Sequence, residues 1–411
     1  MNVADNSVAA VVLTLPSPGS LGIFRSLGRL GVKVYGVDAD PGNPVFKSRY
    51  CADRILWDPK TMSRQDTLRF LRDLAAHIGG HPVLIPPASD ATALLVGDCA
   101  DELSQHFRLQ VPQSALFRGL SDKQEMYVLA KKHGVPTAET TFPRSRQDVM
   151  DFLDSGHASF PLMLKAKNRW PHQQRTGARM VIVASAKELL EKYDLLEDPS
   201  APNLMIQEYI PGGDDSVWMF DGYFNQHSEC LIGITGRKLR QHPVYTGSAS
   251  LGICLENEFV DRTTRAFMKA VGYKGILDLG FRFDSRDGQY KLLDVNPRLG
   301  ATFRLFVADN GLDVVRALYL DVTGQPVLPA EPRWGRKWLV EDNDVVSFHD
   351  YRKDGKITFC EWARSMHGVE EGAWFAADDL RPFGHRALDF GRRCLSWIRT
   401  GSRRSLDLPT D

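Results

Sequence analysis

The segment LLDVNPRLG, residues 292–300, places three polar side chains at the end of an apolar strand. Asp294, Asn296 and Arg298 alternate with apolar residues, so they are expected to share one face of that strand. Pro297 then prevents further hydrogen bonding along the strand. An acid, an amide and a guanidinium that converge at a strand end can hold a cation and an anion together.

A second carboxylate is expected opposite Asp294. The turn SRDG joins two strands, and folding this hairpin about Arg286 sets Asp278 across from Asp294. Facing side chains of an antiparallel pair lie about 5 Å apart, and two carboxylates that close repel each other unless a cation separates them. Asn296 would add a neutral oxygen, and oxygen-only ligands favour Mg²⁺ or Mn²⁺. Asp284 is the alternative second acid, although its position favours a turn role.

Two lysines stand where they could neutralise an anion. Lys123 is expected in the first turn of a helix capped by Ser121 and Gln124, where the helix dipole disfavours a cation. A phosphate beside Lys123 would explain its position, and a tolerated surface lysine is the alternative. Lys165 ends an apolar strand just before the polar loop NRWPHQQRTGAR, which could fold over phosphates or form a solvated hairpin.

The segment from residue 207 to residue 215 combines the groups that a purine nucleotide would need. Its apolar side chains could stack on the base, the polar ones beside them could hydrogen-bond the base edge, and one of two acids could reach the ribose. An ordinary strand exit accounts for the segment equally well on its own. The dipeptide Asp221-Gly222 further along is expected to form a hairpin turn. The nucleotide candidates are Gln207, Glu208, Tyr209, Ile210, Asp214 and Asp215.

A basic segment, TGRKLRQHPVYTGSAS, is expected to be a turn-rich loop. Its Arg237, Lys238 and Arg240 are more charges than a simple connection needs. Such a cluster could bind a small anion. A solvated charged face is the alternative interpretation.

These residues need several domains to position them, because 411 residues are too many for one hydrophobic core. A strand, a glycine-bearing turn, a helix and the strand VKVYGVD form a βαβ unit near the start of the chain, which indicates an open α/β domain. The expected divisions are an α/β domain at 1–118, a small lobe at 119–203, a lobe with the metal site at 204–328, and an extension at 329–411.

The composition is that of a globular protein in a reducing compartment. Apolar residues make up 43% and charged residues 25%, and the formal net charge is zero, which disfavours a general nucleic-acid binder. The six cysteines are scattered without a CxxC pair, which predicts reduced thiols and a cytoplasmic protein.

No membrane span is expected, because no apolar stretch approaches about 18 residues. The start of the chain is interpreted as a first strand and not a signal peptide. The basic, amphipathic segment 385–404 could dock on its own protein, pair with a partner or lie on an anionic membrane surface. Docking on its own protein is the preferred interpretation.

The order of these pieces resembles the ATP-grasp superfamily, specifically its carboxylate–amine ligase branch. The motif DGQYKLLDVNPRLG is the most specific part, and the likeness covers about residues 8–325. The resemblance implies an α/β fold with two α+β lobes after a Rossmann-like pre-ATP-grasp domain. Three departures are that Asp294 replaces a glutamate found in many relatives, that Gly280 occupies a place where an acid is sometimes found, and that the phosphate loop is not glycine-rich.

The resemblance also implies roles for the residues. Lys123 and Lys165 would contact ATP phosphates, and the segment from 207 to 215 would bind adenosine. Mg²⁺ (or Mn²⁺) would be bound by Asp278, Asp294 and Asn296. Catalysis would fall to Lys165, to Arg298 on the transferred phosphate or acyl group, and to Arg240. We hypothesise that Arg240, or else Arg237 or Lys238, orients the carboxylate.

The implied reaction joins a small carboxylate to an amine. Transfer of the γ-phosphoryl group of ATP would give an acyl phosphate, which the amine attacks to form an amide, ADP and phosphate. Loops 168–177 and 237–248 would exclude water from this intermediate. The alternatives are an inactive nucleotide-binding module that recruits a partner and a carboxylase that uses bicarbonate. A homodimer is expected from the resemblance alone.

Overall fold

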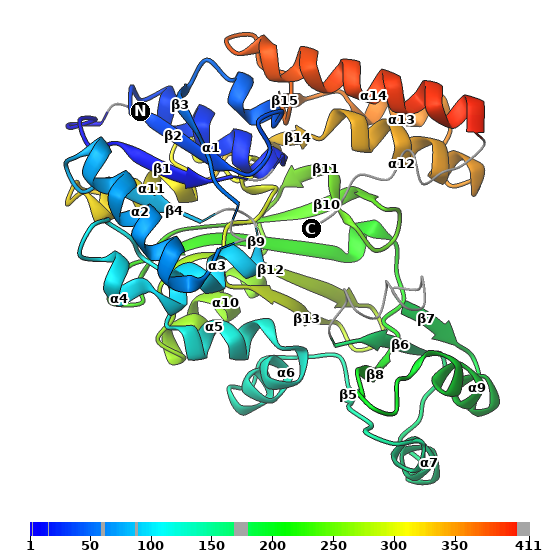
Figure 1. The fold of residues 1–411 in the computed structure, drawn as a ribbon. Coiled ribbons are helices and arrows are strands. Elements are labelled where there is room, and N and C mark those ends of the chain that lie inside the picture. The colour runs from blue at the N-terminus through cyan, green and yellow to red at the C-terminus, as the bar shows by residue number, and fades with distance from the viewer. Residues whose placement is uncertain (2, 15, 59–61, 87–88, 168–179, 401–411) are drawn as a thin grey trace.

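The computed structural model describes residues 1–411 except 2, 15, 59–61, 87–88, 168–179 and 401–411. Within the described residues the strands form three sheets, one of seven strands and two of four, with helices packed around them (Figure 1). This arrangement confirms the predicted α/β fold class. The six cysteines are free, as expected. In the part of the chain described here, no helix is both long enough and apolar enough to cross a membrane.

The N-terminal domain contains a parallel sheet of order β3-β2-β1-β4. All four residues of β1 are buried, as expected for a central strand with both faces covered. The helix that follows β1 begins with Ser17 as its N-cap. The elements are β1 (Ala10–Leu13), α1 (Pro18–Gly28), β2 (Val34–Asp38), η1 (Pro44–Lys47), β3 (Cys51–Leu56), α2 (Arg64–Ile78), β4 (Val83–Ile85), α3 (Asp90–Asp98), α4 (Ala100–Leu103) and α5 (Ser114–Ser121).

The small sheet is antiparallel, in the order β5-β8-β6-β7. β8 pairs with both β5 and β6, so the small lobe extends to Glu208 and does not end at residue 203. The helix α6 belongs instead to the large lobe, because its Met126 and Ala130 join the core around Phe267. The elements are α6 (Lys123–Lys132), β5 (Thr140–Thr141), α7 (Arg146–Asp154), β6 (Leu162–Ala166), β7 (Met180–Val183), α9 (Ala186–Leu196) and β8 (Leu204–Glu208).

The large sheet has the order β13-β12-β9-β10-β11-β14-β15. Its last two strands come from the 329–411 segment, so the C-terminal extension is built into this sheet and is not a separate unit. Its elements are η2 (Asp214–Ser216), β9 (Val217–Phe224), β10 (Cys230–His242), β11 (Ser248–Cys254), α10 (Glu258–Ala270), β12 (Gly275–Asp284), β13 (Gln289–Asn296), η3 (Phe303–Leu305), α11 (Val314–Val322), β14 (Lys337–Leu339), α12 (Glu341–Lys353), α13 (Phe359–Ser365), β15 (Val369–Gly372) and α14 (Leu380–Thr400).

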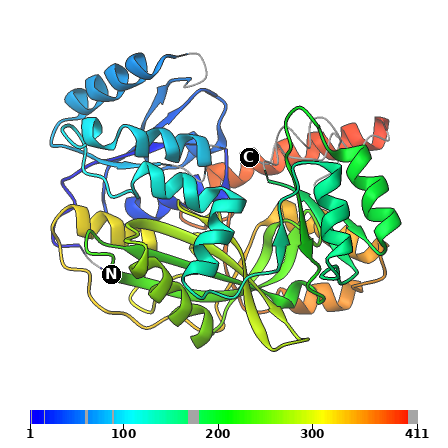
Figure 2. The same ribbon diagram turned by 90° about the horizontal axis from the view of Figure 1, so that it is seen from below.

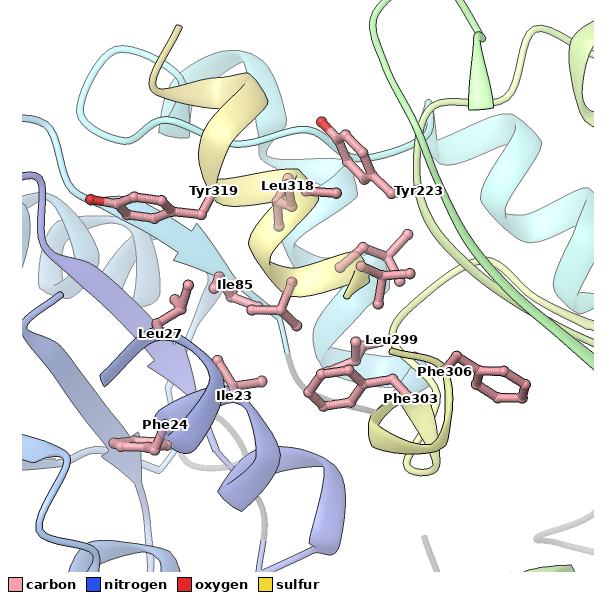
Figure 3. Packing of buried hydrophobic residues seen from close by; sticks show 14 of the residues in the cluster. Ile23, Phe24, Leu27, Ile85, Tyr223, Leu299, Phe303, Phe306, Leu318 and Tyr319 are labelled. Atoms are coloured by element: carbon pink, nitrogen blue, oxygen red, sulfur yellow. The ribbon is translucent and has the colours of Figure 1, made fainter. Parts of the chain in front are cut away.

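A continuous apolar core joins the N-terminal domain to the large sheet. Ile23 and Leu27 of α1 and Ile85 of β4 lie in the same cluster as Phe303 of η3 and Leu318 of α11 (Figure 3). Seen from below, the N-terminal domain and the small sheet with α7 and α9 lie on opposite sides of the molecule (Figure 2). The shared core therefore holds the N-terminal domain in place against the large sheet, on the opposite side of the molecule from the small sheet.

Candidate active site

A single large cleft of about 1770 Å³ contains nearly all of the predicted site residues. It is lined from the N-terminal domain by Asp90, from the small sheet by Met163 and from the large sheet by Met219. Eleven predicted residues line it: Lys123, Lys165, Gln207, Glu208, Tyr209, Ile210, Asp214, Asp278, Asp294, Asn296 and Arg298. Asp215 and Arg240 are not among the lining residues.

The register of the metal hairpin differs from the predicted one. Asp278 pairs with Asn296, and Gly280 is the residue opposite Asp294. Two offsets cause the difference: the pairing next to the turn, Asp284 with Gln289, lies one residue from the predicted one, and a β-bulge at Leu293 then adds one unpaired residue to β13. Without this extra residue, the pairing nearer the turn would continue and Asp294 would point to the other face. The predicted direct opposition of the two aspartates is wrong, but both side chains still face the same side of the sheet.

The three predicted oxygen donors contact cations or one another. Asn296 donates a hydrogen bond from Nδ2 to Asp278 Oδ2 at 3.3 Å, and Arg298 Nη1 lies 3.9 Å from the same oxygen. Burial raises the pKa of Asp278 above its ordinary value. Burial would also raise the pKa of Asp294, but the ion pair with the Lys123 ammonium outweighs it, and that pKa is lowered. The two cations therefore offset the acids in this structure.

A third acid, Asp221, was missed by the sequence reasoning. It does not lie in a hairpin turn but in the middle of β9, where it pairs directly with Asp278. The side chain is 0% exposed, and neither carboxylate oxygen has a hydrogen-bond partner among the described residues. Burial, and then the neighbouring Asp278, raise its pKa well above the usual value. An acid amid the apolar and aromatic residues of VWMFDGYF was the available signal.

The two predicted phosphate lysines lie near each other in the cleft. Lys123 is the first residue of α6, and the cap is Asp122, whose side chain accepts from the backbone N–H groups of Gln124 and Glu125. The predicted helix start is therefore confirmed, although Ser121 is not the cap. Lys165 lies on β6, and burial followed by repulsion from Lys123 lowers its pKa to about 8. Desolvated ammonium groups at this point would bind an anion strongly.

Of the three candidates Arg237, Lys238 and Arg240, Lys238 is the one that lines the cleft. It lies on β10 and not in a loop, because residues 230–242 form one long strand. Its Nζ donates to Gly247 O at 2.8 Å, and it has no ion pair with an acid among the residues described. Burial lowers its pKa, an effect that Asp278 and Asp214 partly oppose.

Arg240 does not have the position that the catalytic prediction requires. Its Nε and Nη2 donate to the two oxygens of Asp344 on α12 at 2.8 and 2.9 Å, and its Nη1 donates to Ser365 Oγ at 2.7 Å. The ion pair is almost fully buried, with side-chain exposures of 5% and 1%. Because the guanidinium is saturated by these partners, Arg240 attaches the C-terminal extension to β10 and does not contact the cleft.

Arg298 connects the large lobe to the N-terminal domain. Its Nε donates to Asp90 Oδ1 at 2.7 Å, and Asp90 is the first residue of α3. Burial would lower the pKa of Arg298, but the charges of Asp90 and Asp278 raise it instead. Asp284, the alternative metal acid, is bound by Arg286 and Lys291 and does not line the cleft. Its turn role is the one that the structure supports.

The predicted adenosine segment lines the end of the cleft beside the small sheet. Gln207 donates from Nε2 to Thr140 Oγ1 at 2.9 Å, while its own Oε1 is buried without a partner among the described residues. The carboxylate of Glu208 is held by Lys291 at 2.8 Å and Arg286 at 3.0 Å. Of the two ribose candidates, only Asp214 lines the cleft. It accepts from Gln241 Nε2 at 2.7 Å and from the Tyr351 hydroxyl.

The candidate metal ligands fit a small hard cation by their chemistry. Asp278, Asp294 and Asn296 supply oxygen atoms on one face of two paired strands. The buried, unpartnered carboxyl of Asp221 adjoins them. No group of three or more His, Cys, Asp or Glu side chains with metal-site geometry occurs among the residues described, so the fit rests on two acids and an amide. The predicted phosphate loop at 168–177 lies outside the described residues.

The three-sheet arrangement with a cleft between the small and large sheets defines the ATP-grasp fold. A solved N5-carboxyaminoimidazole synthetase from Staphylococcus aureus in complex with ADP superposes with a TM-score of 0.61, covering 86% of this chain and 88% of that one at 12% identity. The biotin carboxylase domain of Hydrogenobacter thermophilus 2-oxoglutarate carboxylase, solved with MgADP and bicarbonate, gives a TM-score of 0.61 at 14% identity, covering 80% of this chain and 73% of that one. These likenesses confirm the fold that the sequence resemblance implied.

Sequence comparison adds a ligase relative. The chain is 25% identical over 248 residues to the D-aspartate ligase of Enterococcus faecium, which covers 57% of each protein. The chain thus matches little more than half the length of that curated relative. No family model matches the chain.

Proposed function

We propose that this protein is an ATP-dependent carboxylate–amine ligase that forms an amide bond through an acyl phosphate. The observation that carries the proposal is the convergence, in one cleft, of a predicted metal site and three cationic side chains: Lys123, Lys165 and Arg298. Phosphoryl transfer requires mainly positioning and charge neutralisation, which is what this set of groups supplies. An inactive nucleotide-binding module would have no need for these groups.

The metal and the nucleotide are assigned from the chemistry of the lining residues. Mg²⁺ would be held by Asp278, Asp294 and Asn296, and when bound it neutralises charge on the phosphates. ATP and Mg²⁺ use is supported by the ADP and MgADP complexes of the structural neighbours. ATP would lie with its base beside Tyr209 and Ile210.

The protein's own residues would then act as follows. Lys123, which pairs with Asp294 here, would direct its ammonium to the phosphates, and Asp294 would be among the residues that hold the metal. Lys165 would bind the transferred phosphoryl group as a cation, and Arg298 would orient the acyl group while Asp90 holds its guanidinium. Lys238 would replace Arg240 as the residue that orients the substrate carboxylate. The amine attacks the acyl carbon, the C–O bond to phosphate breaks, and the proton leaves with solvent.

The substrate class is proposed from the D-aspartate ligase relative. An acidic amino acid is therefore the first carboxylate to test. The assay should contain a reductant, as in the cytoplasm, because the cysteines are free thiols. A homodimer, expected from the resemblance, is supported by the dimer described for the biotin carboxylase neighbour and can be tested by sedimentation.

Hydroxylamine trapping tests the acyl phosphate directly. The protein, ATP and Mg²⁺ are incubated with hydroxylamine and with D-aspartate, L-aspartate, short carboxylates or bicarbonate. We expect one carboxylate to give a hydroxamate in equal amount to ADP. ADP release that depends on bicarbonate alone would favour a carboxylase. If none of the acids leads to ADP release, the result would argue for the inactive module.

A further inference from the structure

The C-terminal extension, residues 329–411, forms the end of the cleft that lies beside β14 and β15 of the large sheet. Trp338 of β14, Trp374 after β15 and Arg393 of α14 line it, beside Asp342 and Asp389. None of these residues belongs to the predicted nucleotide or metal site. α14 runs across the top of the molecule from the N-terminal domain towards α12 and α13 (Figure 1), and its Arg386, Asp389 and Arg393 line the cleft.

The two tryptophans each carry a buried N–H group without an acceptor. Both residues are 1% exposed, and neither Nε1 has a hydrogen-bond partner among the described residues. Leaving such a donor buried and unpaired is unfavourable, because the group has lost its hydrogen bond to water. By contrast, the indole N–H of Trp362 in the same extension donates to Asp344 Oδ2 at 2.9 Å. The pair at Trp338 and Trp374 is therefore an exception that calls for an acceptor.

The two arginines beside them differ in their hydrogen bonding. Arg386 donates from Nε to Asp342 Oδ2 at 2.7 Å and stacks over the Trp374 ring at 4.8 Å. Arg393 lies 3.2 Å from Asp389 Oδ2 and 3.8 Å from Asp342 Oδ2, but its Nε and Nη2 make no hydrogen bond within the part of the chain described. Both carboxylates already have an arginine partner.

The atoms of this wall that lack a hydrogen-bond acceptor among the described residues are all donors: Nε1 of two tryptophans, and Nε and Nη2 of Arg393, which face Asp389 and Asp342 in ion pairs without a hydrogen bond. A wall with spare donors fits a ligand that supplies acceptors and negative charge, and a guanidinium flanked by N–H donors suits a carboxylate. We propose that Trp338, Trp374 and Arg393 form a subsite that binds a carboxylate group of the substrate, away from the reacting centre. This inference rests on the proposed function, because it assigns the substrate end of the same cleft.

The subsite would act on substrate selection and not on phosphoryl transfer. A substrate with two anionic groups, such as an acidic amino acid, could place one carboxylate here and present another group to the phosphates. Loss of the subsite is expected to raise KM for that substrate while the affinity for ATP stays constant.

Calorimetric titration of the full-length protein tests the subsite without requiring turnover. The probes are D-aspartate, L-aspartate and succinate, with uncharged succinamide and inorganic phosphate as comparisons. Arg393→Gln and Trp374→Phe remove donors with little change of shape. Arg392→Gln and Trp334→Phe are the matched controls, because both residues are exposed and neither lines the cleft.

We expect at least one carboxylate to bind the wild-type protein, and about tenfold weaker binding in each subsite variant, since each variant removes a hydrogen bond to a charged group. The controls and the affinity for ATP should stay within about twofold by the same reasoning. Retained thermal unfolding temperatures, with Arg393→Lys as a charge-preserving variant, exclude misfolding as the cause.

The inference is overturned if no carboxylate binds, or if the subsite variants bind carboxylates as tightly as the controls do. It is also overturned if phosphate binds as tightly as the carboxylates and its affinity falls by the same factor in the subsite variants. Failed hydroxamate trapping together with intact, variant-sensitive carboxylate binding would overturn the proposed function and leave the subsite standing.

Discussion

Asp221 on β9 and Asp278 on β12 are directly opposed in the large sheet, and Gly300 covers both side chains. A Cβ atom at Gly300 would lie 2.9 Å from Asp278 Cγ and 3.0 Å from Asp221 Oδ2. The two acids therefore share a space that only glycine leaves open. Their proximity makes a nearby cation favourable, whether an arginine or a metal ion.

Gly300→Ala should press on this pair of acids. Because such overpacking costs about 1–3 kcal/mol, we expect a lower free energy of unfolding, measured by urea denaturation. Gly280→Ala on β12 is the control, since a Cβ there meets nothing within 4 Å. Equal stabilities of the two variants would contradict the described packing around Gly300.

Asp294→Asn should abolish turnover and keep the fold. The substitution removes the charge that would hold the metal, and a loss of several kcal/mol in transition-state stabilisation corresponds to at least about 100-fold in kcat. ADP release measures the effect, and circular dichroism checks the fold. Asp215→Asn is the control: it makes the same substitution outside the cleft and should retain activity. A similar loss of activity in both variants would remove the support for the metal site.

Lys165 should make ATP binding sensitive to pH. Its pKa is lowered to about 8 by burial and by Lys123. The side chain is therefore protonated below that pH and loses its positive charge as the pH rises through it. The affinity for ATP should then fall between pH 7 and pH 9.5, with a midpoint shifted upward because bound phosphate favours the charged form. Lys165→Arg should flatten the curve, as titration calorimetry would show. Parallel curves would rule out Lys165 as the titrating group.

Arg240 should contribute to stability and not directly to catalysis. Asp344→Ala leaves the buried guanidinium without its main partner, and breaking such a pair costs about 3–5 kcal/mol. We expect a large loss in unfolding free energy, partly recovered in Arg240→Met/Asp344→Leu. The folded double variant should keep its KM for ATP. A stable double variant without any turnover would return Arg240 to the catalytic residues.

The sequence was sufficient for the features that depend on local pattern. Alternation in LLDVNPRLG placed Asp294 and Asn296 on one face, and the residues around Asp122 predicted the start of α6. These predictions succeeded because side-chain periodicity and helix capping are set by neighbouring residues.

The misses arise from long-range pairing. Asp278 pairs two residues further along β13 than predicted, one residue from the turn and one from the bulge at Leu293, and a bulge cannot be read from alternation alone. Arg240 was placed in the cleft because its partner, Asp344, is 104 residues away in the chain. Asp221 was assigned to a turn because Asp-Gly is a common turn pair, whereas β10 and β12 bury it within the sheet.

Coupled measurement of ADP release and amide formation tests the central claim most directly. The wild-type protein is incubated with ATP, Mg²⁺, an acidic amino acid and a panel of amines, and products are identified by mass spectrometry. The account predicts ADP and a new amide in equal amounts, only when Mg²⁺, the carboxylate and an amine are all present. ADP release that needs no amine and leaves the carboxylate unchanged, or no ADP release with any pair, would contradict it.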